Sequence, residues 1–194
     1  MKTIKRKYLF ISIVFIASFC QNPKENDFPL SIILSRKVLI NNYCKIFNLN
    51  PRLYISVIYG ELINNYNALD NFDETRAYLG FDASIGFAQL RISTIKWIEL
   101  NYSDLPFISQ SSSRKELIEK GLNDTTNVIY SVLYVKLIKE KLSKIYSVRS
   151  IGSYYGIGID KQQKIDKNYT NAIGDSAMAF YFSDRLIKIF DRKD

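Results

Sequence analysis

Residues 50–61 read NPRLYISVIYGE, and this segment predicts a buried helix that begins at Pro51. Asn50 suits the N-cap position, and proline is favoured at the first helical position because its missing N–H would have no helical partner there. At 100° per residue, Glu61 continues the apolar face that contains Val57, and apolar side chains extend around nearly the whole helix. The segment therefore predicts a carboxyl group on the apolar face of a central helix.

Two effects of this position raise the expected pKa of Glu61. Apolar neighbours remove part of its hydration, and the helical pattern fails soon after Asn64, which puts the carboxyl near the negative end of the helix dipole. A carboxyl that keeps its proton near neutral pH serves as a general acid, and once it has lost that proton it serves as a base. The alternative is an ordinary glutamate at a helix end that reaches water or pairs with a lysine.

The composition of the chain narrows the chemistry it can perform. Its 194 residues, 47% hydrophobic and 24% charged, fit one globular domain and favour neither a disordered chain nor a multi-span membrane protein. It contains no histidine, which excludes serine–histidine and cysteine–histidine triads and removes the commonest zinc ligand. Its two cysteines, Cys20 and Cys44, are too few for a thiolate cluster. Any catalysis must therefore use carboxylates, lysine, tyrosine or a lone hydroxyl, and carboxylates are the first candidates.

Residues 1–19 have the anatomy of a signal peptide. Residues 1–7 carry four basic side chains and no acid, and residues 8–19 form an apolar stretch. As a helix this stretch would rise only about 18 Å, too little for a hydrocarbon core of about 30 Å. We therefore expect an exported protein of the periplasm or cell envelope, with residues 20–29 as a polar tether and residues 30–194 as the folded domain.

Residues 17–20, Ala-Ser-Phe-Cys, resemble the lipobox of bacterial lipoproteins, with Phe19 in place of the usual small residue. Acylation of Cys20 would anchor the protein to a membrane. The alternatives are an ordinary signal peptide that is cleaved nearby, and a disulfide between Cys20 and Cys44 in an oxidising compartment. If Cys20 is acylated, Cys44 is a buried small hydrophobic residue.

The net charge is +8, and loss of the signal peptide removes four basic residues and lowers the charge to +4. This mild positive charge favours an anionic partner such as a cell-wall glycan or a lipid surface, and it is also what a solvated lysine-rich surface gives. The sequence has no basic cluster with interleaved aromatic residues, so nucleic acid is not an expected partner.

Helical periodicity and capping residues predict a domain that is all-α or dominated by α-helices. Ser113 and Glu116 have capping-box spacing, while Gly121 suits the end of a helix and Asp124 the start of the next. Only residues 72–91 contain enough turn residues and aromatic residues for a short β-hairpin. The expected helices cover residues 30–47, 51–64, 113–121, 124–145 and 169–190.

Segments in the same order along the chain resemble the motifs of lytic transglycosylases. In that family a proline opens the catalytic helix and the catalytic glutamate follows ten residues later, as Glu61 follows Pro51. Residues 86–94, GFAQLRIST, resemble the family's Gly-Leu-Met-Gln block, including a threonine five residues after the glutamine. Residues 152–156, GSYYG, resemble its Ala-x-Tyr-Asn stretch, and residues 169–173, YTNAI, resemble its closing Tyr-x-x-x-Val helix.

This resemblance implies a monomeric, lysozyme-like helical domain that cleaves the β-1,4 bond between N-acetylmuramic acid and N-acetylglucosamine in peptidoglycan strands. Glu61 would protonate the leaving oxygen and then withdraw a proton from the muramyl 6-hydroxyl, which leaves a 1,6-anhydro end. Gln89 and the backbone near Gly86 would position the sugar, and no metal or organic cofactor would be needed. Tyr154 or Tyr169 would hydrogen-bond Glu61 or stack on a sugar, unless they are ordinary tyrosines of a helical core.

Three residues depart from the family's motifs. Leu62 replaces the serine that follows the catalytic glutamate, Ile92 replaces a proline and Tyr155 replaces an asparagine. Leu62 is the departure that favours a non-catalytic domain, because the serine helps to orient the glutamate or the substrate. The separation of 28 residues between the glutamate and the glutamine exceeds that of the family, which implies an insertion within residues 64–84.

The insertion carries four acidic residues, Asp70, Asp73, Glu74 and Asp82. Asp82 is the candidate for a second catalytic carboxylate because it approaches the block that contains Gln89, and solvated loop charges are the alternative for all four. Hydrolytic lysozymes commonly use such a carboxylate, whereas a lytic transglycosylase needs one glutamate because the sugar's own hydroxyl closes the ring. A hydrolytic lysozyme and a glycan-binding lipoprotein without activity therefore stay open as alternatives.

Overall fold

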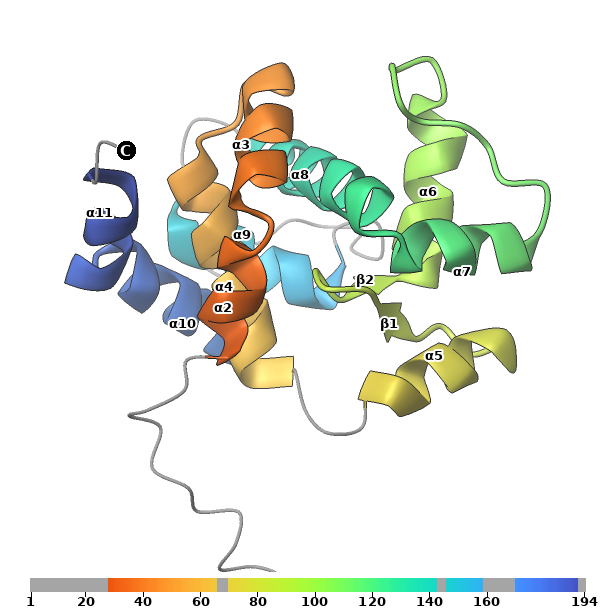
Figure 1. The fold of residues 1–194 in the computed structure, drawn as a ribbon, viewed down its shortest axis with the longest axis horizontal. Coiled ribbons are helices and arrows are strands. Elements are labelled where there is room, and N and C mark those ends of the chain that lie inside the picture. The colour runs from red at the N-terminus through yellow and green to blue at the C-terminus, as the bar shows by residue number, and fades with distance from the viewer. Residues whose placement is uncertain (1–27, 66–69, 143–145, 159–169, 192–194) are drawn as a thin grey trace, which may run out of the picture.

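The structure is a computed structural model that describes residues 28–65, 70–142, 146–158 and 170–191 (Figure 1). Within these residues the chain forms helices and one two-stranded sheet, which confirms the predicted α-dominated fold with a short hairpin. None of the described helices combines the length and hydrophobicity that a membrane-spanning segment requires. In chain order the elements are α2 (Phe28–Leu34), α3 (Lys37–Ile46), α4 (Pro51–Asn65), α5 (Asp70–Tyr78), β1 (Ser84–Ile85), β2 (Leu90–Arg91), α6 (Ile92–Tyr102), α7 (Arg114–Leu122), α8 (Asp124–Lys141), α9 (Val148–Ile157), α10 (Ala172–Tyr181) and α11 (Asp184–Asp191).

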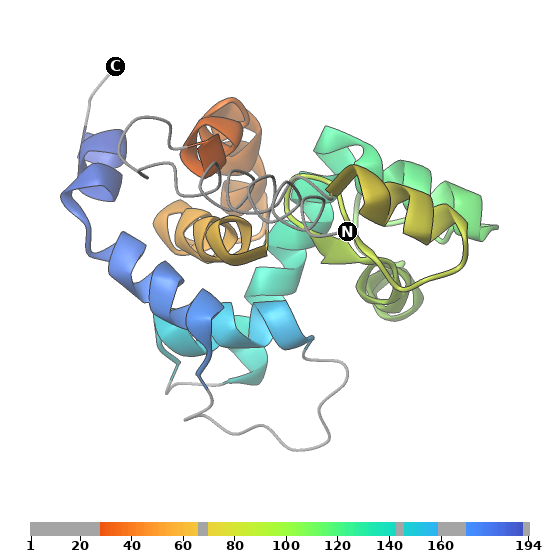
Figure 2. The same cartoon turned by 90° about the horizontal axis from the view of Figure 1, so that it is seen from below.

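Helix α4 is the centre of the fold, and it begins at Pro51 as predicted. Ten consecutive residues from Leu53 to Leu62 are buried, because α10, α9, α2, α3 and α8 pack around the helix (Figure 2). At Gly60 a Cβ atom would lie 2.5 Å from the carbonyl oxygen of Ile173. Glycine at this position therefore allows the backbones of α4 and α10 to approach closely.

Helix α8 connects two groups of elements (Figure 1). Helix α4 and the helices packed around it lie on one side, and α5, the hairpin, α6 and α7 lie on the other. The hairpin is antiparallel, with Ser84 paired to Arg91 and Ile85 paired to Leu90. This arrangement brings the hairpin opposite the C-terminal part of α4, although the two segments are far apart in the sequence.

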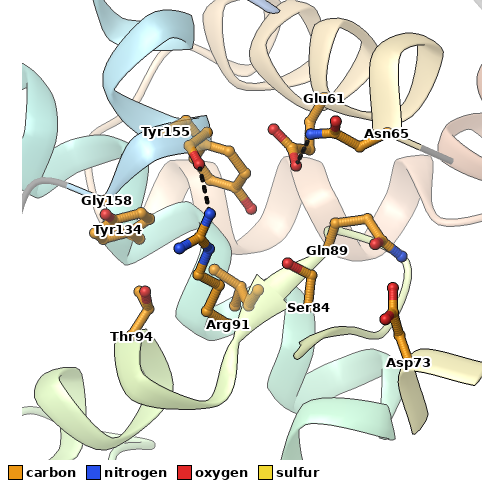
Figure 3. Close-up of a pocket in the computed structure, with 12 residues that line it drawn as sticks. Glu61, Asn65, Asp73, Ser84, Gln89, Arg91, Thr94, Tyr134, Tyr155 and Gly158 are labelled. Atoms are coloured by element: carbon orange, nitrogen blue, oxygen red, sulfur yellow. Dashed lines mark hydrogen bonds between the residues drawn. The ribbon is translucent and has the colours of Figure 1, made fainter. Parts of the chain in front are cut away.

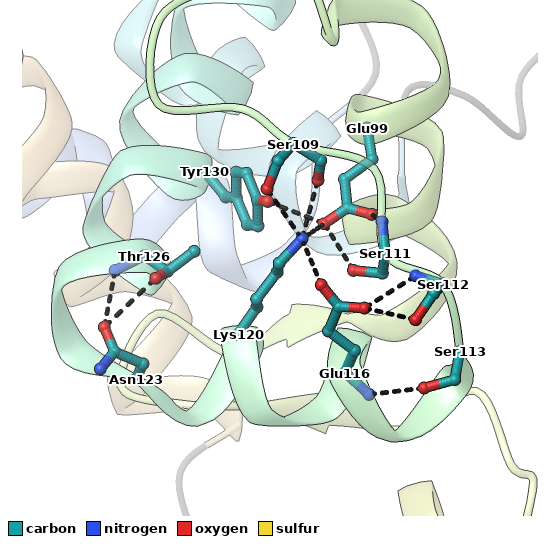
Figure 4. Close-up of polar contacts among 10 residues, drawn as sticks. All are labelled: Glu99, Ser109, Ser111, Ser112, Ser113, Glu116, Lys120, Asn123, Thr126 and Tyr130. Atoms are coloured by element: carbon teal, nitrogen blue, oxygen red, sulfur yellow. Dashed lines mark hydrogen bonds and ion pairs between the residues drawn. The ribbon is translucent and has the colours of Figure 1, made fainter.

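A buried ion pair stabilises the second group and the segment that precedes α7 (Figure 4). Glu99, 3% exposed, accepts hydrogen bonds from Lys120 Nζ at 3.1 Å and from the Tyr130 hydroxyl at 2.8 Å. The backbone N–H of Ser111 donates to the same carboxylate at 2.7 Å, and Lys120 also donates to the carbonyl of Ser109 at 2.8 Å. A buried carboxylate is costly unless it is paired and hydrogen-bonded. These contacts satisfy Glu99 and connect α6, α7 and α8.

The single helix predicted for residues 30–47 is wrong, since the chain forms two helices, α2 and α3. The side chains of Ser35 and Arg36 both donate to the carbonyl of Ile32, at 2.8 and 3.0 Å. The backbone N–H of Arg36 bonds instead to the carbonyl of Ile33, three residues back, at 3.0 Å. Competition from these side chains for one carbonyl therefore interrupts the helix.

The C-terminal helix predicted for residues 169–190 is likewise divided, into α10 and α11. Ser183 lies at the break, where its hydroxyl donates to the carbonyl of Phe180 at 2.7 Å and accepts from the N–H of Leu186 at 3.3 Å. The second contact satisfies a free N–H of α11, as an N-cap does. The predicted start of this helix, and the predicted end of α8 at residues 143–145, lie outside the described residues.

The junction between α7 and α8 differs from the prediction by one residue in each helix. Gly121, predicted at the helix end, lies inside the last turn of α7, where a Cβ would come within 2.4 Å of the Ile85 side chain. Asn123, and not Asp124, is the N-cap of α8, because its side chain accepts an N–H from the first turn. Close packing on the hairpin thus explains the glycine better than helix termination does.

Helix α5 lies within the predicted insertion and was not expected. Ala77 is fully buried, and the neighbouring side chains from Phe72 to Tyr78 are half-buried or exposed, so the segment has no apolar periodicity. The guanidinium of Arg114 fastens the end of this segment, since its Nε donates to the carbonyl of Ala77 at 2.9 Å and its Nη2 to that of Phe81. Tertiary contacts therefore hold a helix that sequence periodicity does not indicate.

Candidate active site

Glu61 lies in the C-terminal part of α4, and its side chain is only 4% exposed. Its Oε1 accepts a hydrogen bond of 2.6 Å from Nδ2 of Asn65, whereas its Oε2 is buried without a partner among the described residues. Burial raises the pKa of Glu61 from its ordinary value of 4.5 to about 7, although the Asn65 hydrogen bond and the charge of Arg91 both lower it. Glu61 therefore exchanges its proton near neutral pH, the range that a group acting first as acid and then as base requires.

Glu61 lines a cavity of about 230 Å³ between the two groups of elements (Figure 3). The lining comes from α4, α5, the hairpin, α6, α8 and α9, so the cavity exists only in the folded chain. Its lining residues are Glu61, Asn65, Asp73, Ser84, Gln89, Leu90, Arg91, Thr94, Tyr134, Tyr155, Gly156 and Gly158. Glu61 and Gln89 are both site residues predicted from the sequence, and the structure brings these two together.

Asn65 orients Glu61 from the next turn of the same helix. Residues four apart lie on one helical face, so the Asn65 amide reaches back to the carboxyl. Leu62, the residue that departs from the family motif, is 1% exposed in the hydrophobic core. Asn65 thus provides the polar contact to Glu61, while Leu62 packs in the hydrophobic core. The sequence signal for this contact is an asparagine four residues after the glutamate, and the prediction did not include it.

The hairpin turn that presents Gln89 is held by a buried asparagine. Gly86 has φ +70°, and a Cβ there would come within 2.2 Å of both the Asn127 amide and the carbonyl of Gly121. Asn127, fully buried in α8, accepts the N–H of Ala88 at 3.0 Å and donates to the carbonyl of Gly121 at 2.6 Å. Gln89 itself has φ +52°, which is uncommon for a residue with a side chain. The turn therefore requires glycine at 86 and an amide at 127.

Tyr155 and Gly156 form the wall of the cavity beside Glu61. The Tyr155 hydroxyl donates to the carbonyl of Ala88 at 2.7 Å, which ties α9 to the hairpin turn. Burial raises the pKa of Tyr155 well above 10, so its hydroxyl keeps its proton. At Gly156 a Cβ would lie 3.4 Å from Oε2 of Glu61 and 2.2 Å from the Ile173 side chain. The glycine therefore leaves room in front of Oε2, the carboxyl oxygen for which the described residues provide no partner.

Two of the predicted substrate-binding residues, Gly86 and Tyr154, do not line this cavity. Gly86 lines an adjoining cavity of about 360 Å³, which shares Ser84 and Gln89 with the first. Tyr154 is fully buried, and its neighbour Tyr155 lines the cavity instead. One residue along a helix rotates the side chain by 100°, which explains why the motif alone did not distinguish the two.

Asp82, the candidate second carboxylate, lies elsewhere. It accepts hydrogen bonds of 2.8 Å from both the backbone N–H and the hydroxyl of Ser93, in the first turn of α6, and it lines a different pocket. The insertion residue in the Glu61 cavity is Asp73, which also pairs with Arg76 at 2.9 Å. Figure 3 shows Asp73 across the cavity from Glu61, beyond Gln89. Helix α5 lies beside the hairpin, and this position brings Asp73, and not Asp82, to the cavity.

Tyr169 and Cys20 lie outside the described residues. Cys44 is a free, fully buried thiol, and burial raises its pKa to about 12. Among the residues that the structure describes, no cluster of three or more His, Cys, Asp or Glu side chains is placed to hold a metal ion.

Comparisons of the chain with protein-family models, with curated proteins and with solved structures found no match. The function of the site therefore rests on its geometry and chemistry.

Proposed function

We propose that this protein is a lysozyme-like enzyme that cleaves the β-1,4 bond between N-acetylmuramic acid and N-acetylglucosamine of peptidoglycan. The observation that carries the proposal is Glu61, a buried carboxyl that faces a polar cavity, with a pKa of about 7 and one oxygen that has no partner among the described residues. A glycosidic oxygen is a poor leaving group until it is protonated, so its cleavage requires an acid of this kind.

The proposed reaction uses Glu61 twice. Its Oε2 proton passes to the glycosidic oxygen as the bond from that oxygen to the muramyl C1 breaks and positive charge develops on the sugar ring. The resulting carboxylate then removes the proton of the muramyl 6-hydroxyl, whose oxygen bonds to C1 and closes a 1,6-anhydro ring. No water is consumed, and Glu61 ends protonated as it began. Asn65 holds Oε1 throughout, which leaves Oε2 to exchange the proton.

The shape of the site suits a polymer. The Glu61 cavity and the adjoining cavity share Ser84 and Gln89, so a chain of sugars that enters one passes over the hairpin to the other. The adjoining cavity contains the aromatic rings of Phe28, half exposed, and Phe87. Aromatic rings beside polar groups are typical of carbohydrate sites, because sugar rings have apolar faces and polar edges.

A hydrolytic lysozyme is the second candidate, and the position of Asp73 favours it. This carboxylate lines the same cavity as Glu61 and comes from a different element. A second carboxylate on the far side of a sugar activates water or attacks C1 directly. In that reaction the product carries a reducing muramic acid end, and Asp73→Asn abolishes turnover while leaving Glu61 intact.

The activity is tested by digestion of purified peptidoglycan sacculi with three matched proteins. Wild type releases soluble muropeptides, and Glu61→Gln releases none because the amide cannot donate the proton. The control is Glu119→Gln, the same chemical change on the exposed surface of α7, where the carboxylate meets only Lys115 at 3.7 Å. Equal release by wild type and Glu61→Gln would refute the proposal. Binding of sacculi by both proteins without release would make this a glycan-binding domain.

A further inference from the structure

Arg91 is the one positively charged residue among those that line the Glu61 cavity. It ends β2 and is the N-cap residue of α6, so both of these elements fix its backbone. Figure 3 shows its guanidinium inside the cavity, with Tyr155 and Glu61 on one side and Thr94 on the other. The other charged residues of the lining, Glu61 and Asp73, are acids.

The guanidinium of Arg91 leaves most of its hydrogen-bonding capacity unused within the described residues. It has five N–H donors, yet within the described part of the chain its one side-chain hydrogen bond is a contact of 3.5 Å from Nη2 to the carbonyl of Gly156. Three other arginines meet carboxylates at hydrogen-bond distance: Arg36 with Asp124, Arg76 with Asp73 and Arg149 with Asp175. Among the described residues Arg91 has no such partner, although it lies in a partly buried position where an unpaired charge is costly.

Planar guanidinium groups bind carboxylates through two parallel hydrogen bonds, which gives both affinity and orientation. Peptidoglycan strands carry carboxylates close to the muramyl ring, either on the lactyl group itself or, where that group is amidated, on the peptide stem. We propose that Arg91 binds a carboxylate of the substrate beside the bond that Glu61 cleaves, and so selects muramyl glycans over uncharged ones. This inference rests on the proposed function, for which it specifies the substrate class.

Binding of this carboxylate also changes the environment of Glu61. In the free protein the charge of Arg91 lowers the pKa of Glu61. The negative charge of a bound anion offsets the charge of Arg91 at Glu61, and this favours the protonated carboxyl. The substrate that Arg91 recognises therefore helps to keep the catalytic proton in place. A merely structural contact between Arg91 and α9 has no such effect on pH dependence.

The experiment measures binding without turnover, by calorimetry with the Glu61→Gln protein. Three tetrasaccharides are compared: one of alternating GlcNAc and MurNAc with free lactyl carboxylates, the same glycan with peptide stems, and uncharged chitotetraose. We expect at least one anionic ligand to bind about tenfold or more tightly than chitotetraose, the scale of one charge-assisted hydrogen bond. The ligand that shows the preference identifies the carboxylate as that of the lactyl group or that of the stem.

The same measurement on double variants assigns the preference to Arg91. Adding Arg91→Met should abolish it, Arg91→Lys should restore part of it because lysine keeps the charge without the planar fork, and Lys96→Met on the exposed face of α6 should leave it unchanged. An unchanged preference in Arg91→Met, or no binding of any ligand, overturns the inference. A preference that depends on Arg91 in a protein whose wild type cleaves no sacculi would instead refute the proposed activity and retain the carboxylate site.

Discussion

The side-chain amide of Asn65 donates a hydrogen bond of 2.6 Å to Oε1 of Glu61, one helical turn earlier in α4. The bond fixes the carboxyl and leaves Oε2, which lacks a partner among the described residues, to exchange a proton in the cavity. It also lowers the pKa of Glu61, which burial raises. One amide thus both orients Glu61 and limits how far its pKa rises.

Replacing Asn65 should separate these two effects. In Asn65→Ala we expect kcat to fall about tenfold, the scale of one hydrogen bond, because the carboxyl is no longer held. The pKa of Glu61 should rise further, so the high-pH limb of the rate profile, where the acid loses its proton, moves to higher pH. The control is Asn64→Ala, whose side chain binds the carbonyl of Gly60 and not Glu61. A profile that shifts to lower pH would contradict this account.

The stability of the protein should fall as the pH rises through the titration of Glu61. Its carboxyl has a pKa near 4.5 in the unfolded chain and about 7 in the folded protein, so between these values the native state binds more protons. The free-energy cost of ionising Glu61 in its buried position is absent below pH 4.5 and complete above pH 7, where it reaches about 3 kcal/mol. Urea unfolding of Glu61→Gln should therefore show a gain over wild type that grows from pH 4 to pH 8. A gain that does not depend on pH would show that the pKa is not raised.

The hairpin turn should be far less tolerant of a methyl group than an exposed turn with similar backbone angles. Gly86 and Gly80 both have positive φ, +70° and +101°, but a Cβ at 86 meets the Asn127 amide at 2.2 Å, whereas at 80 it meets nothing within 4 Å. We expect Gly80→Ala to cost about 1 kcal/mol from backbone strain alone. Gly86→Ala should cost about 3 kcal/mol or more. Equal losses in denaturant melts would argue against the packing of this turn on α8.

Loss of the Asn127 amide should also destabilise the hairpin turn, because this amide bonds the turn to α8. Asn127→Leu leaves the buried Ala88 N–H and Gly121 carbonyl without a partner, which should cost about 2–4 kcal/mol of stability. The matched change Asn101→Leu, at an exposed residue whose amide binds only the Trp97 carbonyl, should cost less than about 1 kcal/mol. Similar losses in the two variants would show that Asn127 does not anchor the hairpin.

The sequence predicted those parts of the fold and the site that depend on local pattern. Pro51 starts the central helix and Glu61 lies on its buried face, because helix starts and apolar faces are encoded within a few residues. The position of Gln89 at the same cavity was predicted from the resemblance of residues 86–94 to a family motif. The break at Ser35 and Arg36 was missed because it depends on which side chains compete for the carbonyl of Ile32. Competition of this kind leaves no trace in apolar periodicity.

The missed parts of the site depend on contacts between distant segments. Asp73 reaches the cavity because Arg114, from α7, fastens α5, and periodicity within the insertion does not indicate that helix. Asp82 was preferred for its proximity in sequence to the Gly-Gln block, and this proximity instead lets it bind the first turn of α6 at Ser93. Arg91 belongs to the motif at residues 86–94, but only the three-dimensional structure shows that it has no carboxylate partner among the described residues.

The most direct test of the central claim is a digest of sacculi by the wild-type protein in water enriched in oxygen-18, followed by mass spectrometry of the released muropeptides. We predict 1,6-anhydromuramyl ends without the heavy isotope, because the sugar's own hydroxyl is the acceptor and Glu61 removes its proton. The Glu61→Gln protein should release nothing. Reducing muramic acid ends labelled with oxygen-18 would contradict the transglycosylase reaction and assign the protein as a hydrolase.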